Sequence, residues 1–181
     1  MTRLHSSLSL AAGVALVALA AGGLQSTANA ASSSATAALQ SADPKVSGTV
    51  VFTQEGSGVH VVADVAGAKP GLHGFHLHEN GVCTAPDYKS AGGHWNPGHA
   101  PHACMPVDPR HAGDLGNITV GSEGTGHLDV VLTGVSVAGA NSVIGKAVVL
   151  HGGEDDCKSQ PSGNAGDRVA CGVVKASTME H

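Results

Sequence analysis

The chain has 181 residues, of which 26 are glycine and only 2% are aromatic, and its formal net charge is −5. A negative chain without a basic stripe gives no support for nucleic acid or another polyanion as a partner. Beyond its first thirty residues the chain has the length of one domain, whose core has to be built from Val, Ile, Leu and Ala.

Residues 1–30 have the pattern of a secretory signal peptide. Arg3 precedes the apolar run LSLAAGVALVALAAGG, which is short for a membrane span, and ANA at 28–30 is a small-x-small cleavage motif. We expect cleavage after Ala30, a mature chain without membrane attachment, and a periplasmic or secreted location; a membrane anchor is the alternative. Residues 31–43 are small and polar and are predicted to form a flexible leader, and residues 44–181 the folded domain.

Six segments resemble strands. The first four alternate side chains with the period of two that is typical of half-buried strands, and the last two are further strand-like runs. Glycine-rich turns separate them. Several short antiparallel strands in a single domain predict an all-β barrel or sandwich. In chain order the strand-like segments are VSGTVVF (46–52), VHVVADV (59–65), NITV (117–120), HLDVVL (127–132), SVIGKAVVLH (142–151) and VACGVV (169–174).

Two long segments, residues 79–114 and 152–168, interrupt the strand pattern. They are rich in glycine and proline and carry histidines, aspartates and three of the four cysteines. Long irregular loops on a compact β scaffold are often functional. We therefore expect two functional loops.

Histidines are concentrated in the stretch GLHGFHLHENG, residues 71–81. On a strand, residues two apart point to the same side, so His76 and His78 should present two imidazoles on one face. His73 has the opposite parity, and we interpret it as a hydrogen-bonded structural histidine. Downstream, His111 and Asp114 are three residues apart around a glycine turn and can close on one ion.

The chain offers more good metal ligands than one tetrahedral zinc can accept. Imidazole suits zinc and copper, and a carboxylate can complete a zinc site. Two metal ions are therefore predicted. The candidate ligands are His76, His78, His94, His102, His111, Asp114 and His151.

Five motifs together resemble the copper–zinc superoxide dismutases: GLHGFHLHE, SAGGHWNP, RHAGDLGNITV, VVLHGGEDD and GNAGDRVACGVV. They occur in the family's order and cover nearly the whole mature chain. The resemblance implies a Greek-key β-barrel of about eight antiparallel strands. It also implies dismutation of superoxide anion to O₂ and H₂O₂, an electric field that draws in the substrate, as is known for this family, and a homodimer as one of the oligomeric states to expect.

The resemblance also implies a role for each site residue. His94 would bridge both ions and carry a proton during the cycle. Asp155 would link a copper histidine to a zinc histidine, with Asp156 as the alternative, and Arg168 would attract the anion with help from Lys158. The ligand sets implied are His76, His78, His94 and His151 for copper, and His94, His102, His111 and Asp114 for zinc.

All four cysteines follow the predicted signal peptide, and their even number favours disulfides. The resemblance pairs Cys83 with Cys171. Cys104 and Cys157 lie outside the common family pattern. Each follows a residue of the predicted His102–Asp155 link by two positions, so we hypothesise a second disulfide. A thiol sensor or a stray metal site is the alternative for this pair.

Two other functions remain open at this point. A copper or zinc buffer without catalytic activity could use the same scaffold, but all seven ligands and Arg168 are present, which favours the enzyme. A two-metal hydrolase would need further acidic ligands around the H-x-H pair. His99 lies between the zinc ligands and is interpreted as a solvent-exposed loop residue.

Overall fold

The computed structural model of the chain describes residues 33–177 and, at the start of the chain, Met1 alone. Apart from Met1, the signal peptide predicted for residues 1–30 lies outside the described residues. Within residues 33–177, no helix has the length and apolar character needed to cross a membrane.

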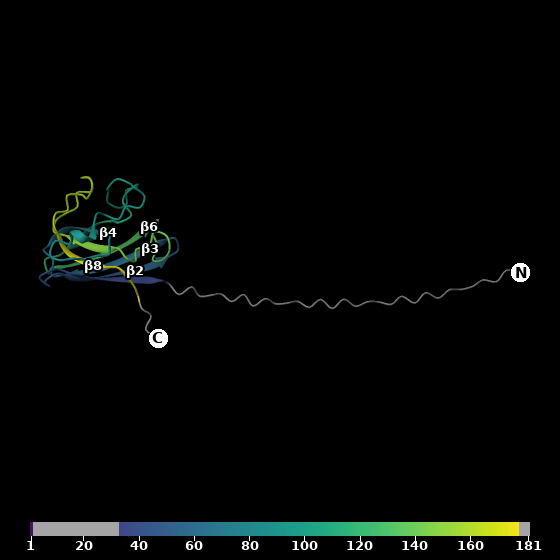
Figure 1. The fold of residues 1–181 in the computed structure, drawn as a ribbon, viewed down its shortest axis with the longest axis horizontal. Coiled ribbons are helices and arrows are strands. Elements are labelled where there is room, and N and C mark those ends of the chain that lie inside the picture. The colour runs from purple at the N-terminus through teal and green to yellow at the C-terminus, as the bar shows by residue number, and fades with distance from the viewer. Residues whose placement is uncertain (2–32, 178–181) are drawn as a thin grey trace. The chain divides into compact units, whose positions relative to one another are not determined.

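Within residues 33–177, eight antiparallel strands close into a barrel, and a ninth short strand extends it (Figure 1). The neighbours run β2-β3-β6-β5-β4-β7-β8-β1, and β1 pairs back with β2; β9 adds to the other side of β1. Non-consecutive neighbours such as β3 and β6 are expected of Greek-key connections, so the predicted fold class is confirmed. The strands are β1 (Ser34–Gln40), β2 (Ser47–Glu55), β3 (Gly58–Ala66), β4 (Gly71–His78), β5 (Asp114–Val120), β6 (Thr125–Thr133), β7 (Ala147–His151), β8 (Arg168–Val173) and β9 (Lys175–Ala176).

The core lies inside the barrel and follows the alternation of the strands. On β3, Val59, Val61 and Ala63 are fully buried while Asp64 is exposed, as the period of two predicts. Phe52 on β2 and Phe75 on β4 are the largest fully buried side chains of the same cluster. The aliphatic core expected from the composition is therefore present.

The prediction of a flexible leader over residues 31–43 is wrong for Ser34–Gln40, and the folded domain begins before residue 44. These residues form β1, which pairs with β2 along its whole length. Ala35, Ala37 and Leu39 alternate into the core, whereas the side chains between them do not. Small residues are weak strand formers, so their alternation was hidden by a composition that resembles a linker.

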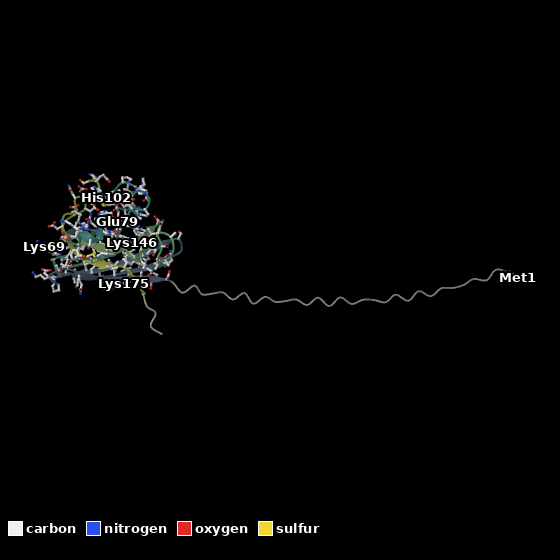
Figure 2. The ribbon with its side chains drawn as sticks, in the orientation of Figure 1. Met1, Lys69, Glu79, His102, Lys146 and Lys175 are labelled. Carbon is white, nitrogen blue, oxygen red and sulfur yellow. A yellow bond between two sulfur atoms is a disulfide. The ribbon has the colours of Figure 1, made fainter. Side chains whose placement is uncertain are left out.

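The two predicted functional loops connect β4 to β5 and β7 to β8, and both project from the same side of the barrel, at the top of Figure 1. The first contains a single turn of 3-10 helix, η1 (Lys89–Ala91). Figure 2 shows His102 on the loop side of the barrel and Lys175 on the opposite side. The strand expected over 142–151 is shorter than predicted, because only Ala147–His151 pairs with neighbouring strands.

Candidate metal centre

Strand β4 carries the first two histidines of the site. All residues from His73 to His78 are buried, so both faces of the strand are covered. Phe75 and Leu77 belong to the barrel core, and His76 and His78 alternate with them on the face covered by the loops. His151 ends β7, the strand that pairs with this part of β4.

The first loop is fastened to the end of β4 by backbone hydrogen bonds. The Trp95 N–H donates to the Leu77 carbonyl, the Leu77 N–H donates to the Gly113 carbonyl, and the Gly113 N–H donates to the Trp95 carbonyl, each at 2.9 Å. A Cβ on Gly113 would collide with the Leu77 carbonyl, so glycine is required at this close approach. These three hydrogen bonds fix the backbone of Trp95. Its neighbour His94 consequently lies beside His78, with which it forms an isolated β-bridge.

In one group of four histidines, a ring nitrogen of each lies close to a ring nitrogen of the others. His78 Nδ1 lies 3.0 Å from the Gly92 carbonyl, which leaves its Nε2 facing His151 Nε2 at 3.4 Å. His151 uses its Nδ1 on the Gly166 carbonyl. His76 Nδ1 and His94 Nε2 are buried without a hydrogen-bond partner. The four rings of this group, whose candidate ligand atoms lie within 4.8 Å of one another, are His76, His78, His94 and His151.

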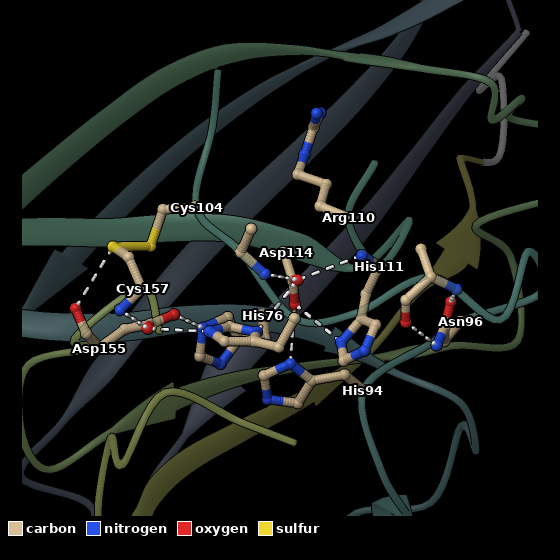
Figure 3. A network of polar contacts seen from close by, with 12 residues as sticks. His76, His94, Asn96, Cys104, Arg110, His111, Asp114, Asp155 and Cys157 are labelled. Atoms are coloured by element: carbon tan, nitrogen blue, oxygen red, sulfur yellow. Dashed lines mark hydrogen bonds and ion pairs between the residues drawn. A yellow bond between two sulfur atoms is a disulfide. The ribbon is translucent and has the colours of Figure 1, made fainter. Parts of the chain in front are cut away.

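A second group gathers around Asp114, the first residue of β5 (Figure 3). The Nδ1 atoms of His94, His102 and His111 lie 2.8, 3.0 and 3.2 Å from its carboxylate oxygens. His102 Nδ1 and His111 Nδ1 are nevertheless buried without a hydrogen-bond partner. These two imidazole nitrogens lie close to the Asp114 carboxylate but form no hydrogen bond with it. Such an arrangement of buried donor atoms is suited to binding a cation.

The donor sets of the two groups differ in character. The first consists of four imidazoles, which suits copper, and the second of three imidazoles and a carboxylate, which suits zinc. His94 belongs to both, with Nδ1 on the Asp114 side and Nε2 on the other. The residues present therefore fit both ions, and the structure brings together every ligand that the sequence analysis named.

Burial keeps three histidines of the first group neutral. It lowers the pKa of His76 to about 4, that of His151 to about 3 and that of His78 to about 2. The pKa of His111 is lowered as well, again mainly by burial. Neutral imidazoles have a free nitrogen lone pair at physiological pH, as metal binding requires.

The Asp155 carboxylate connects the two groups. Its Oδ2 lies 2.8 Å from His76 Nε2 and its Oδ1 lies 3.0 Å from His102 Nε2. Burial alone would raise the pKa of Asp155, but hydrogen bonds from His76, the Cys157 N–H and His102 outweigh burial and hold the pKa well below its usual value. Asp156 is exposed and instead accepts hydrogen bonds from Ser159, so the link belongs to Asp155.

A family model, described as copper/zinc superoxide dismutase (SODC), matches residues 46–174, more than two thirds of the chain. The chain belongs to the copper/zinc superoxide dismutase family. Among solved structures, the chain is similar to the clock protein EA4 with 38% sequence identity and a TM-score of 0.74. The match covers 81% of this chain and 96% of the EA4 chain.

In this superoxide dismutase fold, Arg168 begins β8 beside the first group of histidines. Its Nη1 donates to the Tyr88 carbonyl at 2.8 Å and its Nη2 to the Gly92 carbonyl at 2.6 Å. The Gly92 carbonyl also accepts from His78. One carbonyl thus fixes both the guanidinium and a candidate copper ligand.

Two disulfides fasten the loops of this superoxide dismutase fold, one to a barrel strand and one between the two loops. Cys83 is bonded to Cys171 on β8. Cys104 is bonded to Cys157, with their Cα atoms 5.0 Å apart, the pairing hypothesised from sequence. No cysteine of the described residues is free, so the alternative of a thiol sensor or a cysteine metal site does not apply to this state.

The remaining predicted residues lie outside both groups. His73 is a structural histidine, with ring nitrogens 2.7 Å from the carbonyls of Lys69 and His151. His99 and Lys158 are exposed loop residues.

Sequence reasoning missed the Gly92 and Gly166 carbonyls, which orient His78 and His151. It also missed Asn117, whose side-chain amide holds both backbone groups of Asp155. Backbone carbonyls have no sequence signature, and a single Asn in a strand gives no signal of its own.

Proposed function

We propose that the protein is a superoxide dismutase that binds one copper and one zinc. Family membership supports this function, and the observation that carries the proposal is the pair of histidine groups that share His94. His76, His78, His94 and His151 would hold copper, and His94, His102, His111 and Asp114 would hold zinc. Copper would supply the one-electron chemistry, oxidising one superoxide to O₂ and reducing a second to H₂O₂.

The reaction would also consume protons, and His94 would carry one of them. Its Nδ1 is fixed against Asp114, while Nε2 is buried and without a hydrogen-bond partner. Nε2 can therefore hold a proton in one half of the cycle and release it in the other, while Asp114 keeps the ring oriented. Asp155 maintains the spacing of the two groups through His76 and His102.

Arg168 would attract and orient the anion. The chain carries a net charge of −5, which repels superoxide at long range, so a local cation is needed near the site. The two carbonyl hydrogen bonds of Arg168 fix its guanidinium without neutralising its charge.

We further propose that the protein acts in the periplasm or after secretion. Two disulfides fit an oxidising compartment, and superoxide produced there is not accessible to cytoplasmic enzymes. The predicted signal peptide over residues 1–30 supports the same location, and a homodimer is the assembly to test first.

The deciding experiment measures metal content and superoxide dismutation on one sample of mature protein, with and without added copper. We expect one copper and one zinc per chain and activity that disappears when copper is removed. Bound metal without dismutation would instead assign the protein to metal buffering, the second function that this scaffold could serve.

A further inference from the structure

Three of the four residues of the zinc group lie in the loop before β5, and two tethers join this loop to the loop before β8 independently of any ion. The disulfide between Cys104 and Cys157 joins the loop before β5 to the loop before β8. His102 precedes Cys104 by two positions, and Asp155 precedes Cys157 by two. The disulfide therefore closes directly beside the contact between His102 and Asp155, as Figure 3 shows on the Asp155 side.

The backbone next to the disulfide also positions the two carboxylates. The Cys157 N–H donates to Asp155 Oδ1 at 2.7 Å. On the other side of the bridge, the Ala103 N–H donates to Asp114 Oδ2 at 3.2 Å. Each end of the disulfide thus continues into a hydrogen bond to a carboxylate of the metal centre.

Gln160 forms the second tether between the same two loops. Its Oε1 accepts from the His102 N–H at 2.7 Å, and its Nε2 donates to the His102 carbonyl at 2.8 Å. One side chain thus satisfies both backbone groups of His102. Gln160 itself is exposed, so it holds His102 without belonging to the core.

The far end of this arrangement is anchored to the barrel. Asn117 on β5 accepts from the Asp155 N–H at 2.8 Å and donates to the Asp155 carbonyl at 2.9 Å. Asn117 therefore fixes the backbone of Asp155, and the Asp155 carboxylate meets the ring of His102. Gln160 holds the backbone of His102, and the disulfide joins the two loops two residues beyond His102 and Asp155.

We propose that the Cys104–Cys157 disulfide and Gln160 are positioning elements that pre-form the zinc half of the site before zinc binds. Ordering a long loop costs conformational entropy, and tethers that impose this cost during folding remove it from the binding step. The bound ion should then dissociate slowly. This inference rests on the zinc ligands of the proposed function, but not on dismutase activity.

The test compares zinc release from the zinc-loaded protein into excess chelator. Cys104→Ser combined with Cys157→Ser, and separately Gln160→Ala, should each release zinc about tenfold faster or more, the effect typical of partners that orient metal ligands. Cobalt placed in the zinc site should show an altered visible spectrum in both variants. A role in global stability alone would not change that spectrum.

Each tether has a matched control elsewhere in the chain. Gln54 also clamps backbone with its amide, accepting from the Val137 N–H and donating to the Gly58 carbonyl, but it touches no ligand. Gln54→Ala, and Cys83→Ser combined with Cys171→Ser, should leave zinc release within about twofold of the unmodified protein.

Hydrogen exchange on the metal-free protein tests the pre-formed state directly. The His102 N–H should exchange slowly without metal and fast in Gln160→Ala. Zinc release that is unchanged in Gln160→Ala, or a His102 N–H that is unprotected without metal, would overturn the inference and leave the proposed function intact. Unmodified protein that holds no zinc at all would overturn both.

Discussion

The two halves of the metal centre are built from different kinds of structure. The copper half takes His76 and His78 from β4 and His151 from the end of the neighbouring strand β7, and it shares His94, from the loop after β4, with the zinc half. In the zinc half, His102 and His111 come from a loop, and only Asp114 belongs to a strand. Backbone ladders position the first set, and side-chain clamps and a disulfide position the second.

This difference shows where each half is vulnerable. A strand ligand keeps its place as long as the barrel is folded, because its neighbours in the sheet fix the backbone. A loop ligand depends on specific polar contacts, any one of which can be removed without unfolding the core. Variants should therefore separate copper retention from zinc retention.

The largest expected effect comes from exchanging one ligand in each half. His78→Ala removes a ring that faces only the copper group, so dismutation should fall by about a hundredfold or more while zinc is retained. His111→Ala should lose zinc but keep copper and a measurable part of the activity. Metal analysis and activity on the same samples check both. Loss of copper from His111→Ala would show that the two halves are not separable.

The strand half could be predicted from the residues themselves, because alternation on β4 places His76 and His78 on one face. The loop half could be predicted only in part. The spacing of His111 and Asp114 around a glycine turn indicated a shared ion, but nothing in the position of His102 fixes a loop conformation. Its assignment to the zinc set depended on the family resemblance. The Cys104–Cys157 hypothesis depended on it as well, through the predicted contact between Asp155 and His102.

The second-largest effect is expected at Gly163. This residue lies in the loop between β7 and β8 and packs against the contact between Asp155 and His102. A Cβ there would clash with Asp155 Oδ1 and lie 2.7 Å from His102 Nε2, and the φ angle is +67°. Gly163→Ala should therefore separate the two side chains and weaken zinc binding by about 10- to 100-fold.

Gly139→Ala provides the matched control for this prediction. Gly139 has a φ of +87°, and the space that a Cβ would occupy there is open, so it shares the backbone strain without the clash. Its zinc affinity should match that of the unmodified protein in a chelator competition. Equal weakening in both variants would attribute the effect to backbone strain instead.

A smaller effect is expected where the first loop meets the barrel, at Arg168. Arg168→Ala removes the local cation, and kcat/KM for superoxide should fall about tenfold, with a weaker dependence on ionic strength. Arg168→Lys keeps the charge but cannot reproduce the planar fork that meets the Tyr88 and Gly92 carbonyls, so it should be intermediate. Full activity in Arg168→Ala would remove this residue from the proposed mechanism.

The barrel itself shows a similar limit of sequence reasoning. The alternation of β2, β3 and β6 was predictable because Val, Leu and Phe mark the buried face. In β1 the same alternation is carried by Ala35, Ala37 and Leu39, in a stretch of mostly small residues whose composition resembles a linker. Its place in the barrel follows from pairing with β2, a long-range contact that local composition does not encode.

The smallest expected effect is a change in how steeply the unfolding free energy of the metal-free protein depends on pH. The folded pKa values of His76, His151 and His78 are about 4, 3 and 2, below the value of about 6.5 in an unfolded chain. The unfolded state therefore binds more protons as the pH falls below 6.5. The stability associated with these neutral rings is present above pH 6.5 and is lost as the pH falls toward the folded pKa values.

Asp155 adds to the same trend only in more acidic solution. Its folded pKa is depressed, so its contribution is lost as the pH falls below about 3.9. Between pH 6.5 and 4.5 the slope should therefore come mainly from the four buried histidines whose pKa is lowered, which are His76, His78, His111 and His151. His78→Gln should make the slope shallower by about one quarter to one third. Gln can still donate to the Gly92 carbonyl. Urea unfolding of the metal-free proteins measures this, and an unchanged slope would mean that His78 is not buried as a neutral ring when copper is absent.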